Sequence, residues 1–512
     1  MPQLTDHPER SPQSSAALRT FRVLAFTTGL LIPAIQAAER PNIVFILVDD
    51  LRYDVFGFMD HPYVKTPHID ELARDGMVFH NAFVTTSLCS PSRASFLTGQ
   101  FMHHHRVVNN SDLMPEGTQT FPQQLQASGY EAAFIGKWHM GGSTDAARPG
   151  FDHWVSFRGQ GTYFPKGQKL NVNGSVVTQK KYMTDELTDY ATDWLAACDP
   201  SKPFLLYLSH KGVHGLYDPA PRHLNRYADQ PFVAPVTMAK TKENDLGKPM
   251  WVRDQRNSWH GIEFPYHGRS GQTIAEMYRH YCEMILSIDD SVGKVRAKLK
   301  DKGIHRNTLI VFTSDGGHFW GEHGLIDKRC AYEESIRIPL LACWPDAIKA
   351  GSECNALAAN IDIAPTMLEL AGLDVPDSID GKSLHPLLNN PDSQANRESL
   401  LYEYYWEPAF PQTPTTFCLR EDRFKLIQYH GIWDTDELYD LQSDPQERVN
   451  LIHQKDQQQR VAQMRRALHQ QLRETGGLVI PLGFKRNHGS SQRRESGSPR
   501  NEFPPQFIHP EK

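Results

Sequence analysis

Four apolar segments of strand length dominate the sequence, and each ends abruptly in polar residues. They span residues 42–48, 131–136, 204–209 and 309–314. Uninterrupted apolar runs of this length are typical of parallel strands that are buried on both faces. A helical pattern over residues 274–299, with Gly303 after it, precedes the fourth segment and completes a strand–helix–strand unit. The sequence therefore predicts an α/β fold in which helices flank a large, mostly parallel sheet.

The polar residues that follow these segments are of chemically useful types. They are Asp49 and Asp50, Lys137 and His139, His210 and His214, and Asp315. Taken singly, each is more often a turn, cap or loop residue than a functional group. In an open α/β sheet, however, ligands bind at the carboxyl ends of the strands, where all four sets would meet. Their coincidence at four strand ends indicates one functional crevice.

The segment "CSPSRASFLTG", residues 89–99, adds a cysteine to this picture. Ser90 and Pro91 suit the first turn of a short helix, and Gly99 suits its end. Cys89 would then lie at the positive end of the helix dipole, with Arg93 on the same face four residues later. Such a helix start favours an anion. Together with carboxylates for a metal, this pattern predicts hydrolysis of a sulfate or phosphate ester.

Composition limits the other function classes. The chain has 512 residues, a formal net charge of −6 and seven scattered cysteines without a CxxC pair. Interspersed charges without a basic stripe argue against a nucleic-acid partner. The cysteine spacing indicates neither a disulfide scaffold nor a zinc ribbon, and an odd count leaves one cysteine for chemistry.

The chain divides into four predicted parts. Residues 1–38 resemble a secretory signal peptide, because Arg19 and Arg22 precede an apolar run that ends near Ala38. This predicts export to the periplasm or secretion, with an uncleaved N-terminal anchor or a later start codon as alternatives, and no later segment is long enough to span a membrane. We expect a main domain over residues 39–390, a smaller antiparallel α+β domain over 391–480, and a disordered tail over 481–512.

Six sequence blocks resemble the type I sulfatases of the alkaline phosphatase superfamily. They are "CSPSRASFLTG", "GYEAAFIGKWH", "TSDGGHFWGEHGLIDKR", "NIDIAPTMLELAG", "DGKSLHPLL" and "ELYDLQSDPQERVNL". The resemblance covers residues 41–451, thinly between 215 and 271. It implies an alkaline phosphatase-like main domain with a smaller C-terminal antiparallel domain.

The resemblance also implies a cofactor made from the chain itself. Cys89 would be oxidised to formylglycine by a formylglycine-generating or equivalent maturase. One hydroxyl of the hydrated aldehyde would attack the sulfur, and the other would then lose its proton and expel sulfate. Asp49, Asp50 and Asp315, with the converted Cys89, would bind Ca²⁺, with Mg²⁺ second in order.

Further roles follow from the resemblance. Arg93 would orient the hydrate, Lys137 and Lys328 would bind sulfate oxygens, and His139 would take the proton during elimination. His214 would be the general acid beside the leaving oxygen, and His210, which would bind substrate, is close enough to replace it in that role. His318 is expected to contact substrate. The sequence departs from the family at Gly316, where an asparagine or histidine usually completes the metal shell; a water, His318 or a weakened site are the alternatives, in that order.

The substrate predicted by this resemblance is a sulfated saccharide. The region over residues 215–271 is rich in tryptophan, histidine, arginine and tyrosine, which suits stacking on sugars, although a plain surface loop explains the same composition. Two other functions remain open: a phosphodiester or phosphonate monoester hydrolase of the same superfamily, and a degenerate protein that binds sulfated glycans without turnover.

Overall fold

The structure is a computed structural model that describes residues 40–263, 271–393 and 397–481. The predicted signal peptide and, from residue 482 onward, the predicted disordered tail lie outside the described residues. Among the helices that are described, none combines the length and the apolar character needed to cross a membrane.

The main sheet contains ten strands within the described part of the chain. In spatial order they are β13 (Ser352–Cys354), β2 (Met77–Phe79), β12 (Leu340–Cys343), β9 (Thr308–Ser314), β1 (Asn42–Val48), β8 (Phe204–Ser209), β4 (Glu131–Gly136), β5 (His153–Ser156), β6 (Lys169–Val172) and β7 (Ser175–Thr178). The central strands β9, β1, β8, β4 and β5 are parallel, whereas β12, β6 and β7 run antiparallel to their neighbours. The four predicted strands are therefore direct neighbours, and their carboxyl ends lie along one edge.

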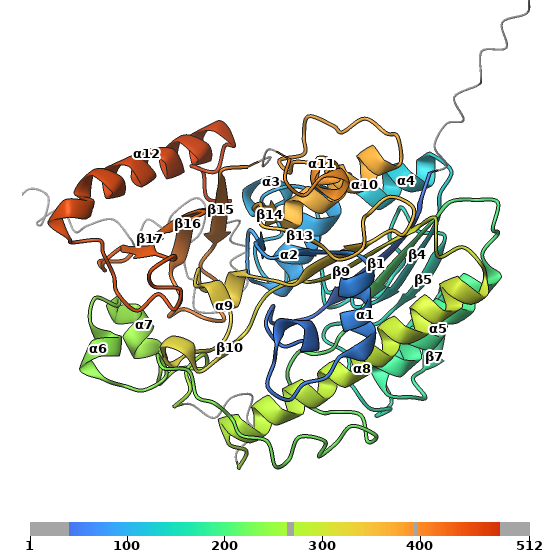
Figure 1. Cartoon of the computed structure of the whole chain (residues 1–512), viewed down its shortest axis with the longest axis horizontal. Helices are drawn as coiled ribbons and strands as arrows, with labels where there is room; N and C mark the ends of the chain where they lie inside the picture. The colour runs from blue at the N-terminus through green and yellow to red at the C-terminus, as the bar shows by residue number, and fades with distance from the viewer. Residues whose placement is uncertain (1–39, 264–270, 394–396, 482–512) are drawn as a thin grey trace, which may run out of the picture. The chain divides into compact units, whose positions relative to one another are not determined.

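Both faces of this sheet are buried. Along β1, Phe45 and Leu47 belong to one hydrophobic cluster, and Val44 and Ile46 belong to the other. The second cluster contains side chains of α1, α5 and α8, whereas the first contains those of α2, α4 and α10 (Figure 1). This burial on two sides is why the strands read as continuous apolar runs rather than as alternating patterns.

The helices are mostly short. Their bounds are α1 (Pro67–Asp75), α2 (Cys89–Thr98), α3 (Met102–His105), α4 (Phe121–Ala127), α5 (Met183–Ala197), α6 (Lys242–Asp245), α7 (Met250–Gln255), α8 (Ile274–Asp301), α9 (Glu333–Ile336), α10 (Ile363–Leu370), α11 (His385–Asn389) and α12 (Gln458–Glu474). The predicted helix before the fourth strand is confirmed as α8, whose first turn has a capping box between Thr273 and Glu276.

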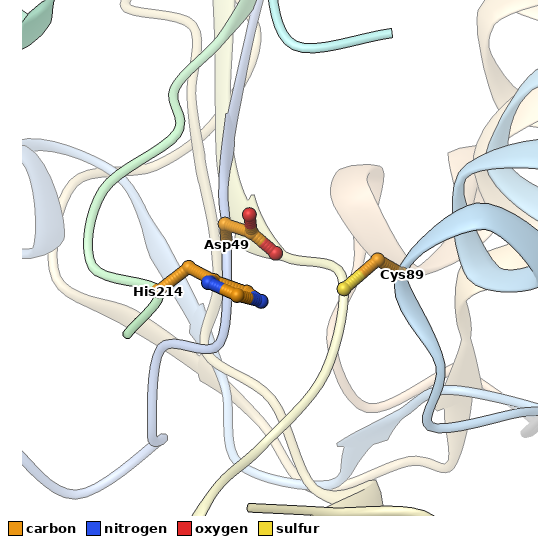
Figure 2. A group of neighbouring side chains, drawn as sticks. All are labelled: Asp49, Cys89 and His214. Carbon is orange, nitrogen blue, oxygen red and sulfur yellow. The ribbon is translucent and has the colours of Figure 1, made fainter. Parts of the chain in front are cut away.

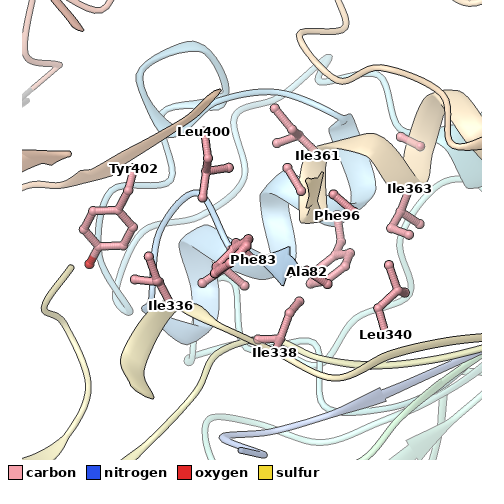
Figure 3. Packing of buried hydrophobic residues seen from close by; sticks show 14 of the residues in the cluster. Ala82, Phe83, Phe96, Ile336, Ile338, Leu340, Ile361, Ile363, Leu400 and Tyr402 are labelled. Atoms are coloured by element: carbon pink, nitrogen blue, oxygen red, sulfur yellow. The ribbon is translucent and has the colours of Figure 1, made fainter. Parts of the chain in front are cut away.

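Helix α2 places Cys89 at the edge of the sheet where the parallel strands end. It begins at Cys89 and ends before Gly99, whose φ of 68° is the left-handed conformation that glycine adopts without strain. All residues of α2 are buried. Phe96 packs among side chains of the short strand β3 (Ala82–Phe83) and of β12 (Figure 3). This packing fixes the start of the helix relative to the strand ends.

A smaller sheet follows in the chain, as predicted. Its antiparallel strands are β15 (Ser399–Tyr404), β16 (Thr415–Glu421), β17 (Phe424–His430) and β18 (Glu437–Asp440). Helix α12 covers this sheet with an apolar stripe that includes Val461, Met464 and Leu468 (Figure 1). Leu400 and Tyr402 of β15 join the same hydrophobic cluster as Phe96, so the two sheets share a core (Figure 3). Two further short pairs complete the strands: β3 with β14 (Ala358–Ala359), and β10 (Phe319–Trp320) with β11 (Ile326–Asp327).

Candidate active site

Three buried carboxylates meet where β1 and β9 end. Asp49 and Asp50 follow β1, and Asp315 follows β9; each is at most 1% exposed. Carboxylate oxygens of the three residues lie within 4.8 Å of one another. Within the described residues, Oδ1 of Asp49 and Oδ2 of Asp50 accept no hydrogen bond. Buried carboxylate oxygens without donors fit a hard divalent cation such as Ca²⁺ or Mg²⁺.

Three cationic side chains surround these carboxylates. Nε of Arg93 donates to Oδ2 of Asp315 at 2.7 Å, and its Nη2 lies 3.6 Å from Oδ1 of Asp49. Lys137 donates to Asp49, and Lys328 donates to Asp50. The sequence predicts that Arg93 orients the formylglycine hydrate. In the structure its guanidinium contacts two of the three carboxylates, those of Asp315 and Asp49.

The same surroundings set the protonation of the carboxylates. Burial raises the pKa of Asp50 to about 7, although Lys328 opposes the rise, and burial with the nearby Asp49 raises the pKa of Asp315 to about 6. Burial also acts on Asp49, but the charge of Lys137 outweighs it and holds the pKa of Asp49 well below its usual value. In the metal-free protein, Asp50 is therefore the carboxylate that takes up a proton nearest neutral pH.

Cys89 faces this group from the start of α2. Its Sγ accepts a hydrogen bond from Nζ of Lys328 at 3.2 Å, and the residue is 1% exposed. Figure 2 shows Cys89, Asp49 and His214 directed toward a common space, and one ligand atom from each lies within 4.8 Å of the others. Burial, followed by the charge of Asp49, raises the pKa of the Cys89 thiol to about 12. The unmodified side chain is thus a protonated thiol at neutral pH and a poor nucleophile.

His139 lies beside Cys89 because of a contact that the sequence did not single out. Oγ of Ser90 lies 3.1 Å from Nδ1 of His139 and donates to the His139 carbonyl at 2.9 Å. Burial and the neighbouring Lys137 hold the pKa of His139 well below its usual value, so the imidazole is neutral and able to accept a proton. Ser90 follows the cysteine directly in the "CSPSR" segment, which is the signal that could have identified it.

His214 approaches the carboxylates from the loop after β8. Asp49 N donates to Gly212 O at 2.8 Å and Val213 N donates to Asp49 O at 2.8 Å, so the loop is fixed to the end of β1. Nε2 of His214 lies 3.8 Å from Oδ2 of Asp50, and the Tyr163 hydroxyl donates to the His214 carbonyl at 2.5 Å. The structure therefore brings His214 together with the predicted metal ligands.

The structure does not bring His210 into the cavity that His214 lines. His210 is fully buried, and its Nε2 lies 3.0 Å from Oγ of Ser291 on α8. Burial lowers the pKa of His210 to about 3, so the ring is neutral. Its side chain contacts α8, which packs on one face of the main sheet, whereas α2 with Cys89 packs on the other face. The predicted contact of His210 with substrate therefore has no geometric support.

His318 is also buried away from the cavity. Its Nε2 lies 2.9 Å from the Tyr217 hydroxyl, and its ring stacks on Tyr281 with centroids 6.0 Å apart. One of its ring nitrogens lies within 4.8 Å of carboxylate oxygens of Asp50 and Asp327. This position relates His318 to the carboxylate cluster more closely than to substrate.

Gly316 leaves room where the family usually has a side chain. A Cβ added at Gly316 would meet only Cδ of Lys328 within 4 Å, at 3.8 Å, which is ordinary van der Waals contact. A side-chain carbon therefore fits at this position, and water as the ligand that completes the metal shell stays a prediction.

A cavity of about 510 Å³ opens above Lys328 and His214, within the size range of small-ligand sites. The lining residues are Asn110, Gln160, Gly161, Thr162, Tyr163, Phe164, Lys166, Lys211, His214, Gly215, Leu216, Asp218, Trp259, Asp327, Lys328, Arg329 and Phe410. Of the region predicted to bind sugars, Trp259 lines the cavity and Trp251 packs against Tyr429, whereas residues 264–270 lie outside the described residues. Lys211 and Asp327 were missed, although each lies beside a predicted site residue.

Comparisons with known proteins agree with this geometry. The sulfatase family model matches residues 41–373, and a model for the C-terminal part of N-sulphoglucosamine sulphohydrolase matches residues 321–474. The chain is 33% identical over 475 residues to the N-acetylglucosamine-6-O-sulfatase of Bacteroides thetaiotaomicron, covering 82% of this chain and 84% of that protein. It is 31% identical over 433 residues to the human N-acetylglucosamine-6-sulfatase, covering 80% and 75%.

A solved structure gives the same result in three dimensions. A protein bound to its substrate, D-glucosamine-2-N,6-O-disulfate, superposes with a TM-score of 0.79 at 30% identity and covers 87% of this chain and 100% of the other. The family match spans most of the chain, and the catalytic blocks meet at one site. The chain therefore belongs to the type I sulfatases of the alkaline phosphatase superfamily and is a sulfuric ester hydrolase.

Proposed function

We propose that this sulfatase removes the 6-O-sulfate from glucosamine residues of a sulfated glycan. The main support for the reaction is the position of Cys89: its Sγ lies 3.2 Å from Nζ of Lys328, which lines the cavity, and within 4.8 Å of a carboxylate oxygen of Asp49. The substrate class is supported by the two N-acetylglucosamine-6-sulfatases and by the relative that binds a 6-O-sulfated glucosamine.

In this proposal Cys89 is converted to formylglycine by a maturase. A hydroxyl of the hydrated aldehyde would attack sulfur. Burial lowers the pKa of His214 well below its usual value, so this ring would take up the proton that the attacking hydroxyl releases and pass it to the leaving sugar oxygen. His139, neutral and held by Ser90, would then accept the proton of the second hydroxyl, so that sulfate would leave and the aldehyde would return. Lys328 would bind sulfate oxygens, and its contact with Cys89 supports this role.

The proposed metal is Ca²⁺, held by Asp49, Asp50 and Asp315 with an oxygen from the converted Cys89. All of these donors are oxygen atoms, and the cluster is fully buried. When bound, the ion supplies positive charge beside the sulfate and acidifies the attacking hydroxyl. Export through the N-terminal segment is part of the proposal and agrees with a glycan substrate outside the cytoplasm.

The test is sulfate release from defined saccharides by protein co-expressed with a maturase. The panel contains glucosamine and N-acetylglucosamine with sulfate at a single position, O3 or O6, together with aryl sulfate and aryl phosphate. We expect release from the 6-O-sulfated sugars and a large preference for aryl sulfate over aryl phosphate. Cys89→Ala is the matched control for contaminating activity. Release from the 3-O-sulfated sugars alone, or faster phosphate release, would refute the substrate or the reaction.

A further inference from the structure

The cavity contains a buried lysine to which the proposed mechanism gives no role. Lys211 follows β8 in the segment "SHKGVHG", lines the cavity and is 4% exposed. Its Nζ lies 4.1 Å from the centroid of the Tyr163 ring. Among the residues that the structure describes, no carboxylate lies within 4.0 Å of this ammonium group and no hydrogen bond satisfies it.

This arrangement is unfavourable for a lysine without a ligand. A contact between an ammonium group and an aromatic face offsets only part of the cost of removing that charge from water. Asp49, Asp50 and Asp218 attract it only at longer range. Burial and the nearby Lys137 accordingly lower the pKa of Lys211 to about 7. An anion in the cavity would supply the partner that the protein lacks.

The sulfate being cleaved already has its own cations. Lys137 and Lys328 contact Asp49 and Asp50 directly, next to Cys89. Lys211 instead lies against Tyr163 in the wall of the cavity. Its Nζ contacts the Tyr163 ring, and the Tyr163 hydroxyl donates to the His214 carbonyl. Because Lys137 and Lys328 pair with Asp49 and Asp50 whereas Lys211 lies over the Tyr163 ring, Lys211 is a buried cation of this cavity that is left for a second group of the substrate.

Resting on the proposed function, we propose that Lys211 binds a second anionic group of the glycan and makes the enzyme selective for glucosamine that carries two negative charges. Two sources have this chemistry: an N-sulfate on the same sugar and the carboxylate of a neighbouring uronic acid. Lys211 is thus a specificity-determining residue, and its loss should weaken binding of the doubly charged substrate only.

The experiment compares Lys211→Met, which keeps the length of the side chain, with Lys211→Arg, which keeps the charge. Lys180→Met, at an exposed lysine outside the cavity, controls for the loss of one positive charge. The substrates are 6-O-sulfo-N-acetylglucosamine, glucosamine N,6-O-disulfate, and a disaccharide of a uronic acid linked to 6-O-sulfo-N-acetylglucosamine. We expect Lys211→Met to raise KM at least tenfold for one of the two doubly charged substrates and less than threefold for the singly charged one.

The charged substrate that responds identifies the source of the second anion, and Lys211→Arg should restore most of the affinity for it. An equal loss on all three substrates, in kcat or in KM, would overturn the proposal, because it would mean that Lys211 positions His214 or binds the cleaved sulfate. If the wild type cleaves none of the three, the proposed function fails. Calorimetry of glucosamine N-sulfate binding, wild type against Lys211→Met, then tests Lys211 separately: equal affinities overturn the N-sulfate role, and a tenfold loss supports it.

Discussion

Replacing Arg93 with methionine removes the only side chain that contacts two of the three carboxylates at once within the described residues. The guanidinium is 2% exposed and donates at 2.7 Å to Asp315, at 2.7 Å to the Lys137 carbonyl and at 2.6 Å to Oγ of Ser209. Methionine fills similar space but leaves the Asp315 carboxylate buried without its cation. Breaking a buried ion pair from one side costs about 3–5 kcal/mol, because the remaining charge stays desolvated.

The assay is thermal unfolding of wild type and Arg93→Met at one scan rate, with EDTA and with CaCl₂. In EDTA we expect the variant to unfold about 3–8 °C lower, since a given free-energy loss shifts the Tm less in a long chain than in a small domain. Calcium should narrow this difference, because a cation bound by the carboxylates partly replaces the guanidinium. Arg93→Lys should lose less, and Arg466→Met, an exposed arginine on α12, should lose nothing measurable. Equal unfolding temperatures in EDTA, or a difference that calcium leaves unchanged, would refute this account of Arg93.

Three further predictions concern the cofactors. Mass spectrometry of active enzyme should find formylglycine at position 89, Cys89→Ala should lack turnover, and Cys89→Ser should accumulate a sulfated serine; full activity with an unmodified thiol would contradict the mechanism. Calcium affinity should fall roughly tenfold from pH 8 to pH 6, because Asp50, with its pKa raised to about 7, must lose its proton before it can bind the ion. Calorimetry in buffers of different protonation enthalpy should detect the proton that Asp50 releases. An affinity that does not change with pH would argue against this role of Asp50. Gly316→Asn should keep activity within a few fold and calcium affinity at least unchanged, since a Cβ at this position makes only an ordinary van der Waals contact with Lys328. If His318→Ala abolishes calcium binding, imidazole rather than water completes the shell.

The strands and the signature helix could be predicted because their patterns are local. A strand buried on both faces is largely apolar along its length. Strands β1 and β8 show this pattern and end just before Asp49 and His210. Helix α2 has proline in its first turn and Gly99 at its end, and both are start and stop signals within ten residues. If the strands are parallel, the sequence therefore predicts that the three carboxylates and Cys89 lie close together.

The direction of individual loop side chains could not be predicted in the same way. His210 and His214 lie on one loop, and only the hydrogen bonds between that loop and the end of β1 turn His214 toward Asp50 and His210 toward Ser291. The burial of Lys211 likewise depends on Tyr163, which is distant in sequence. Nothing in the spacing "SHKGVHG" distinguishes these outcomes, because tertiary contacts decide them.

The charges around Cys89 link metal binding to sulfate binding. In the structure the carboxylates of Asp49, Asp50 and Asp315 are balanced by Arg93 and two lysines, and both lysines donate to carboxylate oxygens. A divalent cation on those oxygens would compete directly with the ammonium groups, which would then lie beside Cys89 without an anionic partner. A sulfate ester would supply that partner at the same place. A bound metal would therefore do more than acidify the nucleophile: it would free two lysines that otherwise pair with carboxylates, and the site would then attract an anion.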